Sequence, residues 1–314
     1  MNHPIFIIAG AAIMDVLARP VNPSVFRTGS IPAKGITMRT GGDAMNEAKA
    51  LSSLGNPVRL ISKLGRDTAG DTIMAECTMS HIDTSCICRS EDIPTSVNIV
   101  LVDDQGERHF ITSPRGTLRN LYPEDIPDSA LEGSKFFCFA SIFVSPFFDN
   151  AALTDLFRRV KDQKMTLCAD MTKCKNKETL ADMKECLSLL DYVFPNYEEA
   201  ALLTGKTDLD DIADAFLQCG VKHVVIKNGS RGCFIKTNQE RWEIPAYSGA
   251  KCIDTTGAGD TFTACFLHAL GKNFSLPDCG RFANAGASIC IENLGACGAG
   301  NDINVILKRA GLEE

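Results

Sequence analysis

The chain has 314 residues, of which 45% are apolar and 23% charged, the composition of an ordinary globular protein that can bury a large core. Its formal net charge of −7 argues against an electrostatic grip on nucleic acid or on anionic lipid, although a local pocket can still bind a small anion. The N-terminus MNHPIFIIAGAAIMD lacks a basic leader, and no apolar run approaches the ~18 residues of a membrane span.

The fourteen cysteines include no C-x-x-C pair, and most stand in apolar runs such as FFCFAS and TLCADM. A free thiol in such a run behaves as a small apolar side chain. This pattern disfavours a disulfide or metal framework and fits a reducing compartment. We therefore expect a cytoplasmic protein without nucleic-acid or membrane partners.

Short apolar runs alternate with segments of helical period along most of the chain. The runs predict strands over 5–11, 58–64, 136–142, 166–171, 192–196 and 223–229. The segments between them predict helices over 43–54, 67–80, 149–163, 176–190 and 208–219, and the C-terminal third predicts helices over 258–270 and 276–292. Continuous apolar strands that alternate with helices predict a mostly parallel sheet covered on both faces.

Two segments break this alternation. Residues 14–40 contain several prolines and glycines, with short alternating runs and no good helix. Residues 95–113 predict a hairpin whose strands are joined through Asp103, Asp104, Gln105 and Gly106. Together they predict a small antiparallel sheet beside the main body, which can serve as a lid.

Two nucleotide-binding patterns are incomplete. LLTGKTD ends like a phosphate-binding P-loop, but position 200 is alanine where that loop needs glycine. Gly205 is interpreted more simply as the C-terminal glycine of a helix. The first strand continues into GAAIMD, which is not a dinucleotide-binding G-x-G-x-x-G.

The stretch DTTGAGDTF, residues 254–262, predicts an anion site. Gly257, Ala258 and Gly259 precede an apolar helix, so their N–H groups and the positive end of the helix dipole face outward. Asp260 would stand beside the bound anion, where a plain helix cap is the alternative. A carboxylate beside a bound anion is electrostatically unfavourable unless it has a function. The acid is therefore better interpreted as the base that deprotonates an attacking hydroxyl. That combination indicates phosphoryl transfer.

The stretch RTGGDAMNEA, residues 39–48, is the second cluster. Gly41 and Gly42 allow close approach of the backbone, and Asp43 and Asn46 begin a helix. A glycine turn with an aspartate cap is the simpler alternative. Asp15 follows the first strand, and ligands of such sheets bind beyond the carboxyl ends of the strands. Asp15 and Asn46 can therefore bind the hydroxyls of a polyol.

In these residues the chain resembles the ribokinase or PfkB family of carbohydrate and nucleoside kinases over essentially its whole length. GGDAMNEA and DTTGAGD match the family's two signatures, PNYEEA supplies its N-x-x-E, and KNGSRGC matches its nucleotide loop. The likeness is greatest to a branch of bacterial sugar kinases typified by YdjH. It implies one domain over 1–314, a ribokinase-like three-layer α/β/α fold, and a β lid from about 14–40 and 92–118.

The resemblance also implies roles for the matched residues. Asp260 would be the catalytic base, and the amides of Gly257, Ala258 and Gly259 would form the anion hole. Asn196 and Glu199 would organise Mg²⁺, with a plain helix-face acid as the alternative for Glu199. The remaining implied positions are Lys227, Gly229 and Gly232 along ATP, Asn284 near the adenine, and Asp254 and Thr256 at a monovalent cation such as K⁺.

Departures from the family pattern bear on the acceptor. Ribokinases carry lysine where this chain has Asp43, and a sugar-binding glutamate near the position aligned with Ser141. Arg115 lies where lid residues of the family approach the sugar, and an arginine there can pair with a carboxylate; a solvated surface arginine is the alternative. These differences predict a ketose or a sugar acid as acceptor in place of ribose.

Two alternatives remain open at this stage. One is a nucleoside kinase, and the other is a non-catalytic sugar sensor with the same fold. Retention of Asp260 and the N-x-x-E pattern argues against a sensor, which needs no base. The resemblance further suggests a homodimer formed through the exposed edge of the lid.

Overall fold

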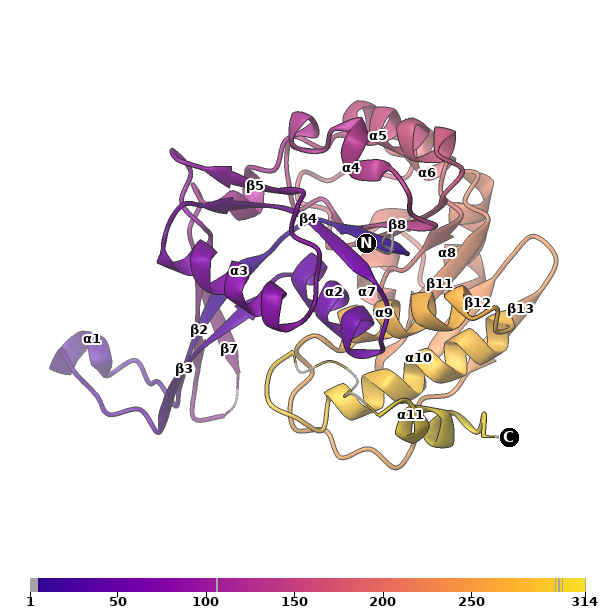
Figure 1. The fold of residues 1–314 in the computed structure, drawn as a ribbon. Helices are drawn as coiled ribbons and strands as arrows, with labels where there is room; N and C mark the ends of the chain where they lie inside the picture. The colour runs from indigo at the N-terminus through magenta and orange to yellow at the C-terminus, as the bar shows by residue number, and fades with distance from the viewer. Residues whose placement is uncertain (1–4, 106, 297, 299, 301, 314) are drawn as a thin grey trace.

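The computed structural model describes residues 5–313 except 106, 297, 299 and 301. Its main sheet has nine strands in the order β13-β12-β11-β10-β9-β8-β1-β4-β5 (Figure 1). The strands are β1 (Phe6–Ala9), β4 (Val58–Gly65), β5 (Ile87–Ser90), β8 (Phe136–Ile142), β9 (Thr166–Met171), β10 (Tyr192–Val193), β11 (His223–Lys227), β12 (Cys233–Lys236) and β13 (Arg241–Ile244). Pairing is parallel from β5 to β11, and only β12 and β13 run antiparallel at the edge.

Helices cover both faces of this sheet, which confirms the predicted three-layer α/β/α class. One face carries α2 (Asp43–Ser53), α3 (Thr68–Met79), α9 (Ala258–Gly271), α10 (Leu276–Cys290) and α11 (Ile303–Ala310). The other carries α4 (Asp128–Leu131), α5 (Asn150–Asp162), α6 (Lys184–Leu187), α7 (Tyr197–Thr204) and α8 (Leu209–Gln218). Successive residues of β1 serve the two cores in turn: Phe6 and Ile8 pack in one and Ile7 and Ala9 in the other.

A second sheet of four strands, in the order β3-β2-β6-β7, projects from the body on the left of Figure 1. Its strands are β2 (Ile13–Arg19), β3 (Gly35–Gly41), β6 (Val97–Val102) and β7 (Arg108–Thr112), with the short α1 (Val25–Thr28) between β2 and β3. The two predicted segments therefore do form a small sheet, and we call it the lid. The expectation that it is purely antiparallel is wrong, because β2 pairs with β6 in parallel and each contributes one antiparallel neighbour.

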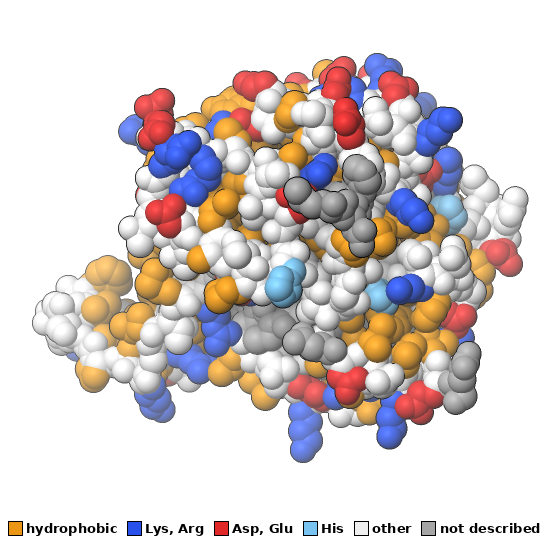
Figure 2. Space-filling view, viewed as in Figure 1, with side chains coloured by type: hydrophobic (Ala, Val, Ile, Leu, Met, Phe, Trp, Pro, Cys, Tyr) orange, Lys and Arg blue, Asp and Glu red, His pale blue; other side chains and the backbone are white. Residues whose placement is uncertain are grey.

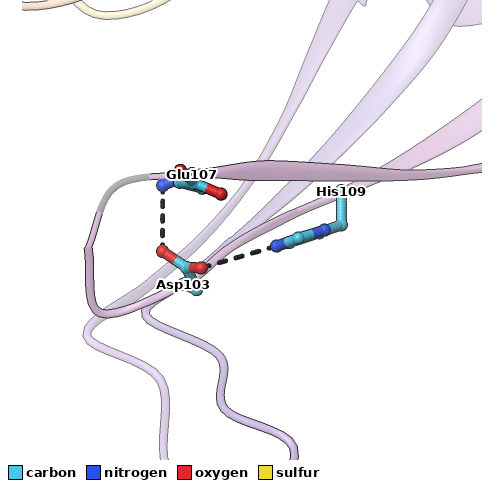
Figure 3. Close-up of side chains that lie close together, drawn as sticks. All are labelled: Asp103, Glu107 and His109. Atoms are coloured by element: carbon cyan, nitrogen blue, oxygen red, sulfur yellow. Dashed lines mark hydrogen bonds and ion pairs between the residues drawn. The ribbon is translucent and has the colours of Figure 1, made fainter.

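The predicted hairpin over 95–113 is confirmed as β6 and β7. Figure 3 shows its turn, where Asp103 accepts hydrogen bonds from the backbone N–H of Glu107 at 2.9 Å and from Nε2 of His109 at 3.4 Å. The Asp103 carboxylate also accepts from the backbone N–H of Gln105, and these bonds lower its pKa. Gly106, which the sequence also places in this turn, lies outside the described residues. The carboxylate thus fixes the turn by pairing with backbone donors, as aspartate does in Asx turns.

The helix predicted over 176–190 is largely wrong, since only α6 is helical there. Lys177 has a left-handed φ of 61°, and Glu178 accepts from both the backbone and the side chain of Asn176. Thr179 donates to Asp182 through its backbone N–H and its hydroxyl. Such local bonds offer the backbone an alternative to helix. The β12–β13 hairpin and α11 were not predicted.

Three short 3₁₀ turns complete the described structure, at Thr117–Arg119, Pro123–Asp125 and Gly229–Arg231. Gly205 ends α7 with a left-handed φ of 67°, as its interpretation as a C-terminal glycine predicts. Cys138, Cys168 and Cys265 are free thiols buried among apolar side chains. Within the described ranges, none of the helices combines the length and the hydropathy that crossing a bilayer needs.

Candidate active site

The glycine pair 41–42 joins the lid to α2 and leaves room for Asp15. A Cβ on Gly41 would lie 2.2 Å from Oδ2 of Asp15. Gly42, the N-terminal cap of α2, has a φ of +93°, and a Cβ there would lie 2.5 Å from the carbonyl oxygen of Ala11. Only glycine fits at both positions, so the pair holds the start of α2 close to the residues that follow β1.

The first turns of α2 and α9 bring the predicted substrate and base residues together. Asn46 Nδ2 donates to Oδ2 of Asp260 at 2.7 Å, although the two residues are 214 positions apart. Asp260 lies in the first turn of α9, whose N-terminal cap is Gly257. Asp43, the first residue of α2, accepts a hydrogen bond from the hydroxyl of Ser141 near the end of β8.

Two cavities meet at this point. A cleft of about 940 Å³ lies between lid and body and is lined, among others, by Asp15, Arg39, Asn46, Lys49, Asp254 and Thr256. A smaller pocket of about 280 Å³ is lined by Asp43, Ala140, Ser141, Asp170, Met171, Thr172, Asn196, Glu199, Lys227, Gly229, Gly259 and Asp260. Because Asn46 lines the cleft and Asp260 lines the pocket, their hydrogen bond marks the junction of the two cavities.

A buried ion pair forms the floor of the small pocket. Lys227 at the end of β11 donates to Oδ2 of Asp170 at the end of β9, and Thr263 of α9 donates to the same oxygen at 2.9 Å. Burial opposes the charge of Lys227, but Asp170, Glu199 and Asp260 around it raise its pKa, so it is a cation. Sequence reasoning missed Asp170. Its position at the carboxyl end of a predicted strand was the available signal.

Asn196 and Glu199 cap the N-terminus of α7. Glu199 Oε2 accepts from the backbone N–H of Asn196, and Asn196 Oδ1 accepts from the backbone N–H of Glu199, both at 2.9 Å. This is a capping box. Burial raises the pKa of Glu199 to about 7, partly opposed by Lys227. The acid is therefore both a helix cap and a wall of the small pocket.

Carboxyl groups are concentrated here. Burial, with Asp43 nearby, raises the pKa of Asp260 to about 8, and burial also raises the pKa values of Asp43 and Asp170. Glu47 of α2, which sequence reasoning also missed, is 0% exposed, and neither of its carboxyl oxygens has a hydrogen-bond partner in the described structure. Burial, Asp170 and Asp260 raise its pKa well above the usual range, so it is neutral.

The predicted cation residues lie at the other end of the 254–259 turn. Asp254 Oδ1 accepts from the backbone N–H of Thr256 at 2.9 Å and from its hydroxyl at 2.7 Å, and Asp254 Oδ2 accepts from the backbone N–H of Gly295 at 2.8 Å. Asp254 is buried, and both residues line the cleft. The first acid of DTTGAGD thus holds the turn that leads to Asp260.

The structure gives the surroundings of three further predicted residues. Asn284 is buried in α10, where its amide donates to the carbonyls of Ile244 and Pro245 at 3.1 Å, so it orients the end of β13. Gly232 packs against the same backbone, and a Cβ there would lie 2.0 Å from the Ile244 carbonyl oxygen. Arg115 is exposed in the loop after β7 and does not line the cleft; the cations that do are Arg19, Arg39 and Lys49. The exposure of Arg115 fits the alternative of a solvated surface arginine, and an inward contact with the sugar stays a prediction.

A half-buried acid at a helix N-terminus, a lysine and a small pocket beside a larger cleft are groups of the kind that phosphoryl transfer uses. The model of the pfkB carbohydrate kinase family matches residues 6–303. The chain belongs to that family and is an ATP-dependent carbohydrate kinase.

Relatives agree with this assignment. The chain is 30% identical to a ribokinase of Staphylococcus aureus over 264 residues, which is 82% of this chain and 83% of the relative. It is 25% identical to a probable fructokinase-5 of Arabidopsis thaliana, covering 94% of each. Among solved structures, Arabidopsis thaliana ribokinase complexed with ribose and ATP superposes with a TM-score of 0.82 at 25% identity, over 99% of this chain and 100% of the other.

Proposed function

We propose that this kinase transfers the γ-phosphoryl group of ATP from the small pocket to a hydroxyl of a monosaccharide held in the cleft. The observation that carries the proposal is the hydrogen bond between Asn46 and Asp260 at the junction of the two cavities. Asn46, which we propose binds sugar hydroxyls, thus contacts Asp260, which we propose accepts their proton. The Arabidopsis thaliana ribokinase complexed with ribose and ATP supports a sugar and ATP as the two kinds of substrate.

Each group has one task in this proposal. The backbone N–H groups of Gly257, Ala258 and Gly259 and the ammonium of Lys227 stabilise charge on the transferred phosphoryl group. Asp260 accepts the proton of the attacking hydroxyl. Asp15 and Asn46 orient the sugar, and Asn196, Gly229 and Gly232 lie on the nucleotide side.

The residues present fit a divalent cation. Asp170 and Glu199 offer hard oxygen ligands in a pocket lined by four acids and one lysine, and Mg²⁺ prefers such ligands together with phosphate. When bound, Mg²⁺ would neutralise phosphate charge. Asp254 and Thr256 are proposed to hold a monovalent cation such as K⁺ through oxygen ligands.

We propose a ketose or a sugar acid as acceptor. Asp43 and Ser141 bond to each other at the wall of the small pocket, where ribokinases carry lysine and glutamate. A sugar carboxylate would find the ammonium of Lys49 in the cleft.

The test is ADP release measured over ribose, other aldoses, ketoses, sugar acids and nucleosides, each with Mg²⁺ and ATP. We expect one monosaccharide to stand out, and Asp260→Asn to lower its turnover by ~10²-fold or more. Binding of a sugar without ADP release would indicate a sensor. Turnover limited to nucleosides would contradict the proposed acceptor class.

The pH dependence is a further expected outcome. Because the pKa of Asp260 is raised to about 8, its basic form becomes more abundant as pH rises through that region. The kcat/KM for the sugar should therefore increase from pH 6 toward an apparent pKa near 8, since this ratio reports the free enzyme. A profile that is flat between pH 6 and pH 9 would argue against Asp260 as the base.

A further inference from the structure

Residues 294–296, here called the bridging segment, contact three parts of the site. Arg39 of the lid donates from Nη1 to the carbonyl oxygen of Leu294. Gly295 donates from its backbone N–H to Asp254 at 2.8 Å. Ala296 lies directly against Gly257, since a Cβ built on that glycine would lie 2.5 Å from the Cβ of Ala296. The bridging segment therefore joins the lid to the turn that begins α9.

Arg39 reaches this segment across the cleft. It lies on β3, in register with Asp15 on β2, and lines the cleft that separates the lid from the body. Gly295 leaves the space for its guanidinium, because a Cβ there would lie 2.3 Å from Nη1 of Arg39. The arginine thus connects the sheet that faces the sugar to the backbone beside Asp254.

A shift of the bridging segment has a direct route to the anion-binding amides. The carboxylate of Asp254 divides its two oxygens between Gly295 on one side and Thr256 on the other. Thr256 is followed by Gly257, whose amide begins the anion hole. Stabilisation of a transition state depends on donors placed within a fraction of an ångström, so small movements of this turn affect turnover strongly.

We propose that Arg39 is a positioning residue that couples closure of the lid over the sugar to the orientation of the 257–259 amides. The inference rests on the proposed role of those amides. In the arrangement described here, Arg39 of the lid contacts the bridging segment, and the segment contacts Gly257 and Asp254. When the lid opens, this support is lost and the anion hole loosens until a sugar is enclosed.

The cleft offers a matched control. Arg19 of β2 lines the same cleft and carries the same charge, but it makes no hydrogen bond or ion pair with the part of the chain that the structure describes. Both arginines are exposed, so neither substitution should prevent folding. The pair separates loss of charge from loss of the contact with Leu294.

The kinetic test compares Arg39→Ala, Arg39→Lys and Arg19→Ala at saturating sugar and ATP. We expect Arg39→Ala to lower kcat about 10-fold or more, with less change in the KM for ATP. Arg39→Lys keeps a donor and should restore part of kcat, and Arg19→Ala should keep it. A rise in the KM for sugar with unchanged kcat would overturn the proposal and make Arg39 a substrate contact.

Hydrogen–deuterium exchange tests the coupling without any activity measurement. In the sugar-free protein, amides of 253–260 should exchange faster in Arg39→Ala than in the wild type or in Arg19→Ala, while those in the middle of α9 stay equal. Equal exchange over 253–260 in all three proteins would overturn the coupling. This readout stays valid even where the ADP assay rejects the proposed acceptor, so the two proposals fail separately.

Discussion

At the scale of single residues, motif spacing predicted the candidate site residues but not the burial that shifts their pKa values. Asp260, Asn46 and Glu199 were predicted from the motifs DTTGAGD, GGDAMNEA and N-x-x-E. This was possible because neighbouring residues determine glycine turns and helix N-termini. Asp170 and Glu47 were not predicted, because each is a single acid whose surroundings depend on the packing of α2, β9 and α9. Local sequence does not contain that contact.

Asp260 should lower the free energy of unfolding at the pH values at which its carboxylate can act as a base. Its pKa rises from 3.8 to about 8 on folding. Between those values the unfolded chain has released the proton and the folded protein still binds it, so stability falls as pH rises from about 4 to about 8. Asp260→Asn removes this loss, and it should raise Tm at pH 8 by about 2 °C or more.

Differential scanning fluorimetry without nucleotide checks this at pH 5 and pH 8. The gain in Tm should shrink toward pH 5, where the wild-type acid is neutral in the folded protein. Asp155→Asn on the exposed face of α5 is the matched control and should change Tm equally at both pH values. A lower Tm for Asp260→Asn at pH 8 would show that the carboxylate stabilises the fold.

At the scale of elements, the pattern of apolar runs predicted every parallel strand from β4 to β11 except the short β5. It failed over 176–190, where apolar residues have helical spacing but Lys177 and Thr179 take up turn conformations. Period alone cannot detect side chains that bond to nearby backbone.

Substitutions of Glu199 at the N-terminus of α7 can distinguish helix capping from metal binding. Glu199→Gln keeps an oxygen that can accept from the N–H of Asn196, so the capping box and Tm should be retained. The lost carboxylate should raise the Mg²⁺ concentration needed for half-maximal rate about 10-fold or more. Glu199→Ala should show the same metal defect and a loss of about 1 kcal/mol in stability. Unchanged Mg²⁺ dependence in both variants would leave Glu199 as a helix cap alone.

At the scale of the whole molecule, the lid exposes apolar side chains that nothing else in the described chain covers. Met38, Val16, Ile99 and Ile111 lie opposite one another in register across its four strands. Met38 is 66% exposed and Ile111 54% exposed, and apolar side chains are visible over this projecting part in Figure 2. A contiguous apolar row on a protruding sheet is typical of an interface. A second copy of the chain is a partner of matching chemistry, because a twofold axis would place the same apolar row against itself.

We therefore propose a homodimer through the lid, and the test is size-exclusion chromatography with light scattering at micromolar concentration. The wild type should show twice the mass of one chain. Met38→Asp and Ile111→Asp place a charge in the row and should each give a monomer, because an unpaired charge at a dry interface costs several kcal/mol. Leu202→Asp on α7, exposed by 55% but far from the lid in sequence and fold, is the matched control and should stay dimeric. A monomeric wild type, or a dimer that survives both lid substitutions, would place the contact elsewhere and leave the lid as a cover for the sugar within one chain.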